Sequence, residues 1–234
     1  MTGTLLNTLA VVIGASLGLL LGRRLPDQMR TTVMHGLGLV TLVAGLRMAS
    51  GTANILIVMG SILLGGVIGE WLRIEDGLQM LGDRLQARFK SSSSASLAEG
   101  FVTASLIFCV GPMAILGSIR DGMVGDYSLL AIKSLLDGFA SLALAASLGI
   151  GVLFSAASVL VMQGSISLLA AVAKVGLSEA MVTEMSAAGG VVMMGISLLL
   201  LDLKRIRVAS LLPAIVIAPL IVAILAALGI SIRP

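Results

Sequence analysis

The chain has few charged residues, few aromatic residues, one cysteine and one histidine. Only 12% of its 234 residues are charged and 3% are aromatic, whereas about a quarter of the residues in a soluble globular domain are charged. With no aromatic platform and no basic stripe, nothing favours nucleic-acid binding. A single cysteine, Cys109, forms no disulfide within the chain, and with only one histidine present it argues against a structural zinc site.

Motifs of soluble enzymes are absent as well. The sequence contains no GxxxxGK[ST], no HExxH and no CxxC pair. The stretch HGLGLVTL lacks the third glycine of the dinucleotide-binding pattern and lies inside an apolar run. No nucleophile stands beside a general base in a recognisable pattern, so we expect neither an enzyme nor a bound cofactor or metal.

The chain consists mainly of long apolar runs, with 58% hydrophobic residues and a mean hydropathy of +1.12. A spanning helix needs about 20 such residues, and these runs do not alternate as the strands of a membrane barrel do. The sequence therefore predicts an all-α, polytopic transmembrane bundle that forms one domain over residues 1–234. The eight candidate spans are 4–21, 33–49, 53–72, 98–118, 128–148, 151–173, 181–201 and 208–230.

Two stretches between the spans need separate interpretation. The fifth and sixth spans are divided only by the GIG sequence at 149–151, so that division depends on length alone. In the region 73–97, apolar residues recur at helical spacing with charges on the other face, and serines follow. This pattern predicts an amphipathic helix on the membrane surface and a serine-rich linker, although a solvated helical loop fits it equally well.

The basic residues indicate the orientation in the membrane. If the N-terminus lies outside, three loops on the cytoplasmic side contain Arg23, Arg24, Arg30, Arg73, Arg84, Arg88, Lys90, Lys204, Arg205 and Arg207. The outer side then contains Arg47, Arg120, Lys174 and Arg233. Because cytoplasmic loops carry an excess of lysine and arginine, we expect both termini outside the cytoplasm.

An internal repeat is suggested by a shift of 152 positions, which places Gly38 on Gly190 and Leu46 on Leu198. The shift maps residues 1–72 onto 152–230, and an offset of five spans reverses the orientation of the second unit. The basic residues of the first unit follow its first helix, whereas those of the second unit follow its second helix, as an inverted repeat requires. Inverted-repeat transport folds place the substrate near the midplane, so a 3+3 repeat around a central helix pair predicts a transporter.

The fourth span contains Gly111-Pro112 near its middle. Proline removes a backbone hydrogen bond and clashes with the preceding turn, and freed carbonyls in hydrocarbon need protein or water partners. One interpretation is a discontinuous helix whose backbone, together with Ser118, binds a ligand. An ordinary proline kink is the alternative.

The fifth span contains Lys133 and Asp137, one helical turn apart. Counted from Ser128, Asp137 falls near the bilayer midplane, and Gln163 lies midway along the sixth span. Charges at that depth cost about 2.5–3.5 kcal/mol each on insertion scales and tend to be functional. We therefore expect Asp137 to bind an ion or proton, with Lys133 tuning it or being displaced. A purely structural tie between helices remains the alternative.

Weaker polar and small-residue signals also occur. Asn7 is expected to form a polar contact between helices. Glu184 enters the seventh span from outside and is expected at the outer interface, with a gate residue as the alternative. Glycines recur every four positions, at Gly14, Gly18 and Gly22 and again at Gly65 and Gly69. Such spacing favours close helix packing, either within the fold or across a homodimer.

The order of three segments resembles the YqgA/YdfK-like bacterial membrane proteins, a family of unknown function. These segments are GTLLNTLAVVIGASLGLLLGRRLP at the start, FCVGPMAILGSIRDGMVGDYSLLAIKSLLDGF in the middle and SLLPAIVIAP near the end. The resemblance covers essentially the whole chain and is most specific from Phe108 to Phe139. It implies a bacterial, multi-pass inner-membrane protein and supplies no substrate or site residues.

These observations favour a transporter of a small ion or polar solute that works by alternating access. Its expected site comprises Lys133, Asp137, Gln163, the Gly111-Pro112 break and Ser118. A narrow channel is an alternative within transport. A different class is a membrane scaffold or assembly subunit, in which the glycines would carry the function and the Lys133–Asp137 pair only stability.

Overall fold

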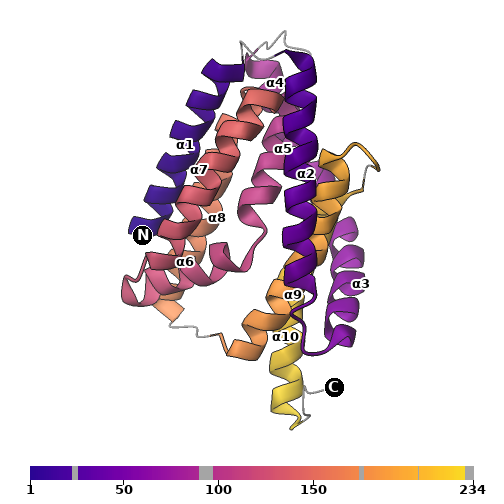
Figure 1. Cartoon of the computed structure of the whole chain (residues 1–234). Coiled ribbons are helices and arrows are strands. Elements are labelled where there is room, and N and C mark those ends of the chain that lie inside the picture. Colours follow the sequence, from indigo (N-terminus) through magenta and orange to yellow (C-terminus); the bar gives the residue numbers. More distant parts are fainter. Residues whose placement is uncertain (23–25, 90–96, 174–176, 205, 230–234) are drawn as a thin grey trace. The chain divides into compact units, whose positions relative to one another are not determined.

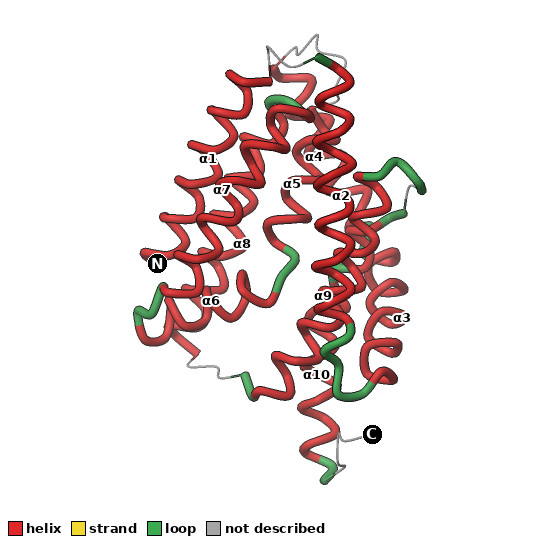
Figure 2. Tube along the Cα trace, in the orientation of Figure 1, coloured by secondary structure: helices red, strands yellow, loops and turns green. Residues whose placement is uncertain are grey.

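Helices make up most of the described chain (Figures 1 and 2). The computed structural model describes residues 1–22, 26–89, 97–173, 177–204 and 206–229. Within these ranges the residues form ten α-helices and one short 3₁₀ helix, with no strand. The prediction of an all-α fold is thereby confirmed.

The helices are α1 (Thr2–Gly22), α2 (Asp27–Ala49), α3 (Ile55–Trp71), α4 (Ile74–Phe89), α5 (Leu97–Cys109), α6 (Pro112–Val124), α7 (Ser128–Leu148), α8 (Gly151–Ala173), α9 (Glu179–Leu200), the 3₁₀ helix η1 (Val208–Leu211) and α10 (Pro213–Ala227). Among the described residues, six helices are long and apolar enough to cross a membrane. Two bent pairs, α3–α4 and α5–α6, raise the number to eight if each pair is one span.

The predicted division at the GIG sequence is present in the structure. Helix α7 ends at Leu148 and α8 begins at Gly151. Gly149 between them has φ +79°, in the left-handed region that glycine adopts without a steric penalty. A helix does not continue through a residue with this φ, so the long apolar stretch 128–173 folds as two helices.

Two predicted spans differ in detail from continuous helices. The fourth is a discontinuous helix, as one of the two interpretations of Gly111-Pro112 predicts, because α5 ends at Cys109 and α6 begins at Pro112 with a bend of 62° between them. The eighth begins with the 3₁₀ turn η1 before α10 starts at Pro213. The helix predicted after residue 73 is α4, while the serine-rich linker at 90–96 lies outside the described residues.

The chain forms two compact units, which we describe separately. Unit 1 contains residues 1–36, 78–109 and 113–175, and unit 2 contains residues 37–77, 110–112 and 176–234. Unit 1 is therefore built around α1, α5, α6, α7 and α8. Unit 2 is built around most of α2, α3, α9, η1 and α10.

Within unit 1, α1 packs closely along α7. A Cβ atom added to Gly14 would overlap the carbonyl oxygen of Gly138, and one added to Gly22 would meet the backbone of Ala146. Because the partner numbers rise together along the two helices, α1 and α7 run parallel, as Figure 1 shows. Helices α5 and α8 are also parallel, since Gly151 packs on Leu97 while Ser105 and Ser158 hydrogen-bond further along.

Within unit 2, two antiparallel pairs form the packing. Gly65 meets Ala214 and Gly69 meets Ser210, so α3 runs against α10 and η1 in the opposite direction. Gly38 meets Leu201 and Gly45 meets Gly190, so α2 and α9 are also antiparallel. The predicted close packing of the glycine series therefore occurs within the fold.

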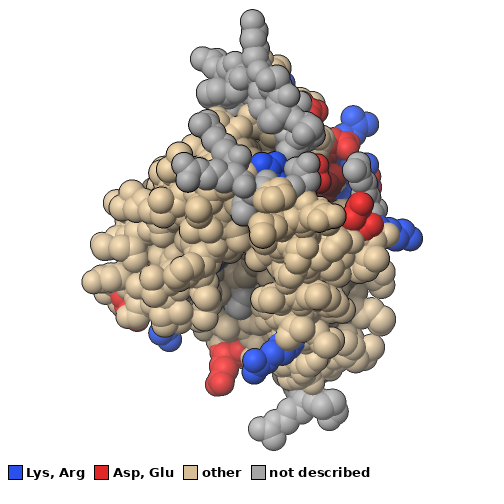
Figure 3. Space-filling model, turned by 45° about the horizontal axis from the view of Figure 1, so that its top comes forward, with Lys and Arg blue, Asp and Glu red and all other residues tan. Residues whose placement is uncertain are grey.

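Large apolar side chains remain exposed along these helices. On α3, residues Ile55, Leu56, Leu63, Leu64 and Val67 are all more than half exposed. Uncharged residues cover most of the face shown in Figure 3, and the acidic and basic side chains lie toward its margins. Apolar exposure on this scale fits a surface in contact with lipid, and the chain is a membrane protein.

The two units do not coincide with the predicted repeats 1–72 and 152–230. One feature nevertheless agrees with a repeat, namely that α2 pairs antiparallel with α9 and α3 pairs antiparallel with α10. Helix α1 contacts α8 through Thr4 and Ser167, and α8 runs back along the parallel pair α1–α7. The inverted repeat itself stays a prediction.

Candidate functional site

The Lys133–Asp137 pair lies inside unit 1. Lys133 Nζ donates to Asp137 Oδ2 at 2.6 Å, and both residues are only 6% exposed. Helix α7 extends nine residues before Asp137 and eleven beyond it, so the carboxylate lies near the middle of a membrane-length helix. The pair forms because residues four apart lie on the same face of a helix.

Asn7 of α1 supplies the second bond to this carboxylate. Its Nδ2 donates to Asp137 Oδ2 at 2.9 Å, and its side chain is fully buried. The close approach of α1 and α7 at Gly14 brings Asn7 within reach. The prediction that Asn7 forms a polar contact between helices is correct but incomplete, because the group it binds is Asp137. Asn7 lies about two helical turns before Gly14 and so on the same face of α1 as the glycine series. The sequence spacing alone indicates this shared face.

Gln163, near the middle of α8, is fully buried, and neither its Oε1 nor its Nε2 has a hydrogen-bond partner. One turn later on α8, Ser167 contacts Thr4 of α1 and the carbonyl of Ser118. Because α8 runs opposite to α1 and Ser167 meets Thr4, we infer from the helix register that Gln163, one turn before Ser167, lies at the level of Asn7. We call Asn7, Lys133, Asp137 and Gln163 the Asp137 cluster.

The end of α5 lies beside the part of α8 that contains Gln163. Ser105 pairs with Ser158 at 2.9 Å, and Ser167 Oγ donates to the carbonyl of Ser118 on α6 at 2.9 Å. Between these two contacts α5 ends at Cys109, opposite the part of α8 that contains Gln163. Cys109 also lies close enough to Lys133 and Asp137 to interact electrostatically with both.

At the break, α5 ends at Cys109 in unit 1, residues 110–112 belong to unit 2, and α6 continues in unit 1 from Met113. The last carbonyls of α5 and the first N–H groups of α6 lack partners within their own helices. Ser118 itself is buried and donates its hydroxyl to the carbonyl of Ala114 at 2.6 Å. Its side chain is thus engaged within α6, and its backbone carbonyl binds Ser167.

The sequence does not predict the role of a buried acid on α6 that contacts the start of α1. Asp121 on α6 is 3% exposed and accepts the backbone N–H of Gly3 at 3.1 Å and the terminal amino group of Met1 at 3.1 Å. It therefore satisfies free N–H groups at the first turn of α1. No sequence signal indicates this, because the contact joins residues more than a hundred positions apart.

Glu184 in unit 2, expected at the outer end of its span, lies near the start of α9 beside the turn between α2 and α3. It is fully buried on α9 and accepts the Thr52 hydroxyl at 2.7 Å and the backbone N–H of Ala53 at 2.7 Å. The N–H of Asn54 also donates to it, at 3.2 Å. Glu184 thereby fixes the turn between α2 and α3, a tertiary contact that periodicity does not predict.

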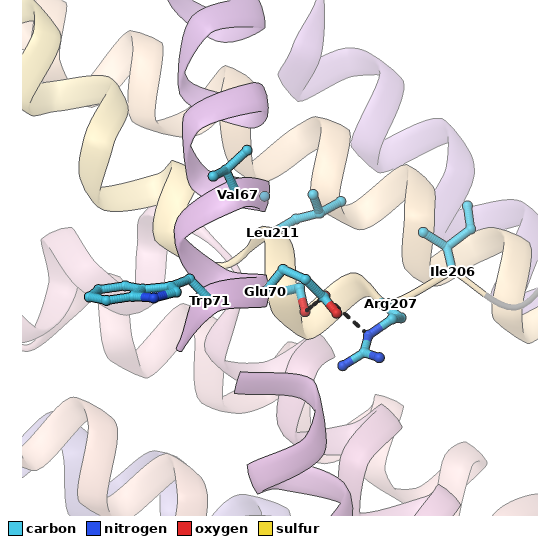
Figure 4. A pocket seen from close by; sticks show the side chains of 8 residues that line it. Val67, Glu70, Trp71, Ile206, Arg207 and Leu211 are labelled. Atoms are coloured by element: carbon cyan, nitrogen blue, oxygen red, sulfur yellow. Dashed lines mark hydrogen bonds and ion pairs between the residues drawn. The ribbon is translucent and has the colours of Figure 1, made fainter. Parts of the chain in front are cut away.

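Unit 2 also contains an open pocket of about 620 Å³ between α3 and η1. Arg207 Nε lies 3.2 Å from Glu70 Oε2, and its Nη2 lies 2.6 Å from Asp76 Oδ1. Figure 4 shows the Glu70 and Arg207 side chains pointing toward each other while Trp71 points away. These charges are about half exposed, so they contribute little stability, and the acids already neutralise the arginine.

The comparisons with known proteins confirm the family resemblance that the sequence suggests. Residues 2–223 match a family model described as "Protein of unknown function (DUF554)". The chain is 28% identical over 235 residues to "Uncharacterized membrane protein YdfK" of Bacillus subtilis (strain 168), covering 98% of this chain and 99% of that protein. It is 32% identical over 220 residues to "Uncharacterized protein YqgA" of Escherichia coli (strain K12), covering 92% and 94%. No solved structure matches.

Proposed function

Since the chain belongs to the DUF554 family, whose function is unknown, we propose from its own site that it transports a small ion or polar solute across the membrane. The observation that carries this proposal is the ion pair of Lys133 and Asp137, buried in the middle of a spanning helix. Ionisable groups at that depth are rare, and they mark substrate or ion pathways.

The energetics support a task for the pair beyond holding helices together. Desolvating two charges costs several kcal/mol per ion, so replacing a buried pair with apolar residues is often neutral or stabilising. Two further buried polar side chains, Asn7 and Gln163, are only partly satisfied or not satisfied at all. Buried polar groups without hydrogen-bond partners destabilise the folded protein, so such a cluster is poorly suited to a purely structural role. A ligand that pairs with these groups would remove that cost.

The break between α5 and α6 supports a carrier mechanism. Non-helical backbone at membrane depth is tolerated where it is buried in protein or lines a cavity, and transporters bind substrate at such breaks near the midplane. A carrier encloses its site and exposes it alternately to each side. The high burial of the cluster favours this behaviour over a permanently open channel.

The parallel packing of α1 and α7 supports an eight-span arrangement. Three spans between them, α2, α3 and the bent α5–α6 pair, would return the chain to the side where α1 began. Eight crossings then leave both termini on the same side, and the basic loops favour the outside. We propose the bacterial inner (plasma) membrane as its location, a proposal that the apolar helices and the two bacterial relatives support.

The scaffold alternative loses its main support. The glycine series on α1 and α3 was its candidate for binding other chains. Gly14, Gly18 and Gly22 instead face α7, and Gly65 and Gly69 face η1 and α10. A homo-oligomer, if formed, would use other surfaces.

The first test is the thermal stability of the purified protein in detergent against ions, amino acids and other polar solutes. A ligand that binds only the folded state stabilises it by about 2.7 kcal/mol at a concentration of 100 Kd. We expect one solute class to stabilise the wild type and to lose its effect in Asp137→Asn. The same solute should enter liposomes containing the wild-type protein with saturable kinetics.

Asp126→Asn is the matched control, because it removes an aspartate charge from the turn before α7, outside the spanning segment. It should respond to the solute as the wild type does. Flux that rises linearly with concentration would favour a channel instead. If no solute stabilises the wild type and no flux occurs while Asp137→Asn only melts earlier, the pair is a structural tie and the transport proposal fails.

A further inference from the structure

Three polar atoms in the Asp137 cluster lack hydrogen-bond partners although they are buried. They are Asn7 Oδ1, Gln163 Oε1 and Gln163 Nε2. In addition, both bonds to the carboxylate use Asp137 Oδ2, which leaves Oδ1 outside them. Buried polar groups are normally paired, so each exception calls for a partner that binds there.

The chemistry of these free positions is mainly that of oxygen acceptors. Three of the four atoms are oxygens, one of which belongs to a carboxylate, and only Gln163 Nε2 is a donor. Small hard cations prefer carboxylate and amide oxygens as ligands, whereas an anion would need donors. The orientation of Asn7 supports this reading, because its amide nitrogen must face Asp137 and its oxygen must therefore face elsewhere.

Lys133 already occupies the position of a cation. Its ammonium group lies 2.6 Å from Asp137 Oδ2 and carries one positive charge. The group sits at the end of a flexible four-carbon stem, so it can leave the carboxylate by side-chain rotation without moving α7. Asp137 is the one acidic member of the cluster, so it balances a single positive charge at a time.

We propose, building on the transport function above, that the ion handled by this protein is a small monovalent metal cation that displaces the Lys133 ammonium from Asp137. Asn7 Oδ1 and the Gln163 amide oxygen serve as further ligands. In the empty protein Lys133 acts as a tethered substitute for the cation and keeps the carboxylate neutralised. Because the two positive charges compete for one carboxylate, the cation binds more weakly than the oxygens alone would allow.

The test uses the full-length protein in detergent, in a choline chloride buffer of constant ionic strength. Sodium, lithium and potassium chloride each replace choline stepwise while the melting temperature is followed. We expect one of them to stabilise the wild type at saturable concentrations. Lys133→Met should lower the half-saturating concentration at least tenfold, because the tethered competitor is gone. Lys133→Arg, which keeps a tethered charge, should not lower it.

Two further variants test the ligand set. Asp137→Asn should abolish the response, and Asn7→Leu should raise the half-saturating concentration of the same cation. Asp126→Asn should leave it unchanged. If Lys133→Met does not fold, Lys133→Gln replaces it, and binding of radioactive sodium to the wild type is measured in parallel against the other two cations.

The possible outcomes separate this inference from the proposed function. Equal responses of the wild type, Lys133→Met and Asp137→Asn would mean a nonspecific salt effect and would overturn it. If no metal cation stabilises any variant while an amino acid or other solute does so through Asp137, the cation assignment fails and transport stands. If nothing binds and liposomes show no flux, both fail.

Discussion

Asp137 in unit 1 and Glu184 in unit 2 are both buried carboxylates on membrane-spanning helices, and their partners differ. Asp137 binds the end of a lysine side chain and an asparagine amide. Glu184 binds a threonine hydroxyl and the backbone N–H groups of Ala53 and Asn54. The first set consists of side chains that rotate, and the second consists mainly of groups fixed by the turn between α2 and α3.

The difference separates an exchangeable site from an anchor. A carboxylate held by backbone N–H groups keeps its partners as long as the turn is folded, so Glu184 is suited to fixing that turn. The ammonium group on Asp137 can be replaced by another cation without a change in the backbone. The Asp137 cluster, unlike the Glu184 side chain, also contains buried polar atoms with no hydrogen-bond partner, on Asn7 and Gln163. Burial of an acid therefore does not by itself indicate a binding site, whereas exchangeable partners do.

The largest effect on stability is expected when the ion pair is broken from one side. Removing one partner of a buried pair leaves the other charge uncompensated, which costs about 3–5 kcal/mol. Asp137→Asn and Lys133→Met should each lower the free energy of unfolding by up to that amount. The double variant Lys133→Met/Asp137→Asn should lose less than the sum of the two, with a coupling energy of about 2 kcal/mol.

The free energies of unfolding of this double-mutant cycle are measured in mixed detergent micelles. The change in melting temperature caused by the solute reports binding in the same samples. The double variant should recover stability without recovering the response to any ligand. Additive losses would mean that the two side chains do not interact as the structure shows. A double variant that still binds the solute would remove Asp137 from the site.

A smaller loss is expected at Glu184. Glu184→Ala deprives the turn at Thr52–Asn54 of its acceptor, and an unsatisfied buried donor costs about 1–3 kcal/mol. We expect a decrease of about 2–3 kcal/mol in the free energy of unfolding, partly restored in Glu184→Gln, which keeps one acceptor oxygen. The increase in melting temperature caused by the solute should be the same as in the wild type. A lost solute response in a folded Glu184→Gln protein would refute the anchor role.

The sequence predicted those parts of the fold that depend on local pattern. Apolar run length placed most helix ends to within a few residues, although α2 begins six residues before and α6 ends six residues after the predicted span. The GIG division held because Gly149 adopts a conformation through which a helix does not continue. The Lys133–Asp137 contact followed from helical spacing alone. By contrast, hydropathy does not show that α5 and α6 meet at an angle of 62°. The contacts of Asp121 and Glu184 join distant segments, and no periodicity encodes them.

The same contrast explains how much of the site was predicted. Polar residues in the middle of spans are costly, which predicts Lys133, Asp137 and Gln163 as site residues, and the structure places all three in unit 1. The role of Asn7 depends on the parallel packing of α1 and α7, which requires knowledge of the tertiary fold. Proximity to the Gly111-Pro112 break predicts Ser118 as a ligand, but its hydroxyl donates to the carbonyl of Ala114 within α6. Single residues were therefore predictable, and their partners were not.

The smallest effect is expected at Asp126, an exposed aspartate that provides a baseline for the two buried acids. Hydrogen bonds from the Ser128 hydroxyl and backbone N–H, helped by Arg120, lower the pKa of Asp126 below its usual value. A carboxylate whose pKa is lowered by folding stabilises the folded state above its ordinary pKa, and this contribution disappears as the pH falls through the lowered value. Asp126→Asn keeps an acceptor for Ser128 and removes only the charge, so it should melt slightly below the wild type at pH 7. The difference should vanish in melting curves recorded below the lowered pKa of Asp126, where the wild-type carboxyl is protonated as well. A difference that persists or grows in acid would show that the charge of Asp126 is not its source.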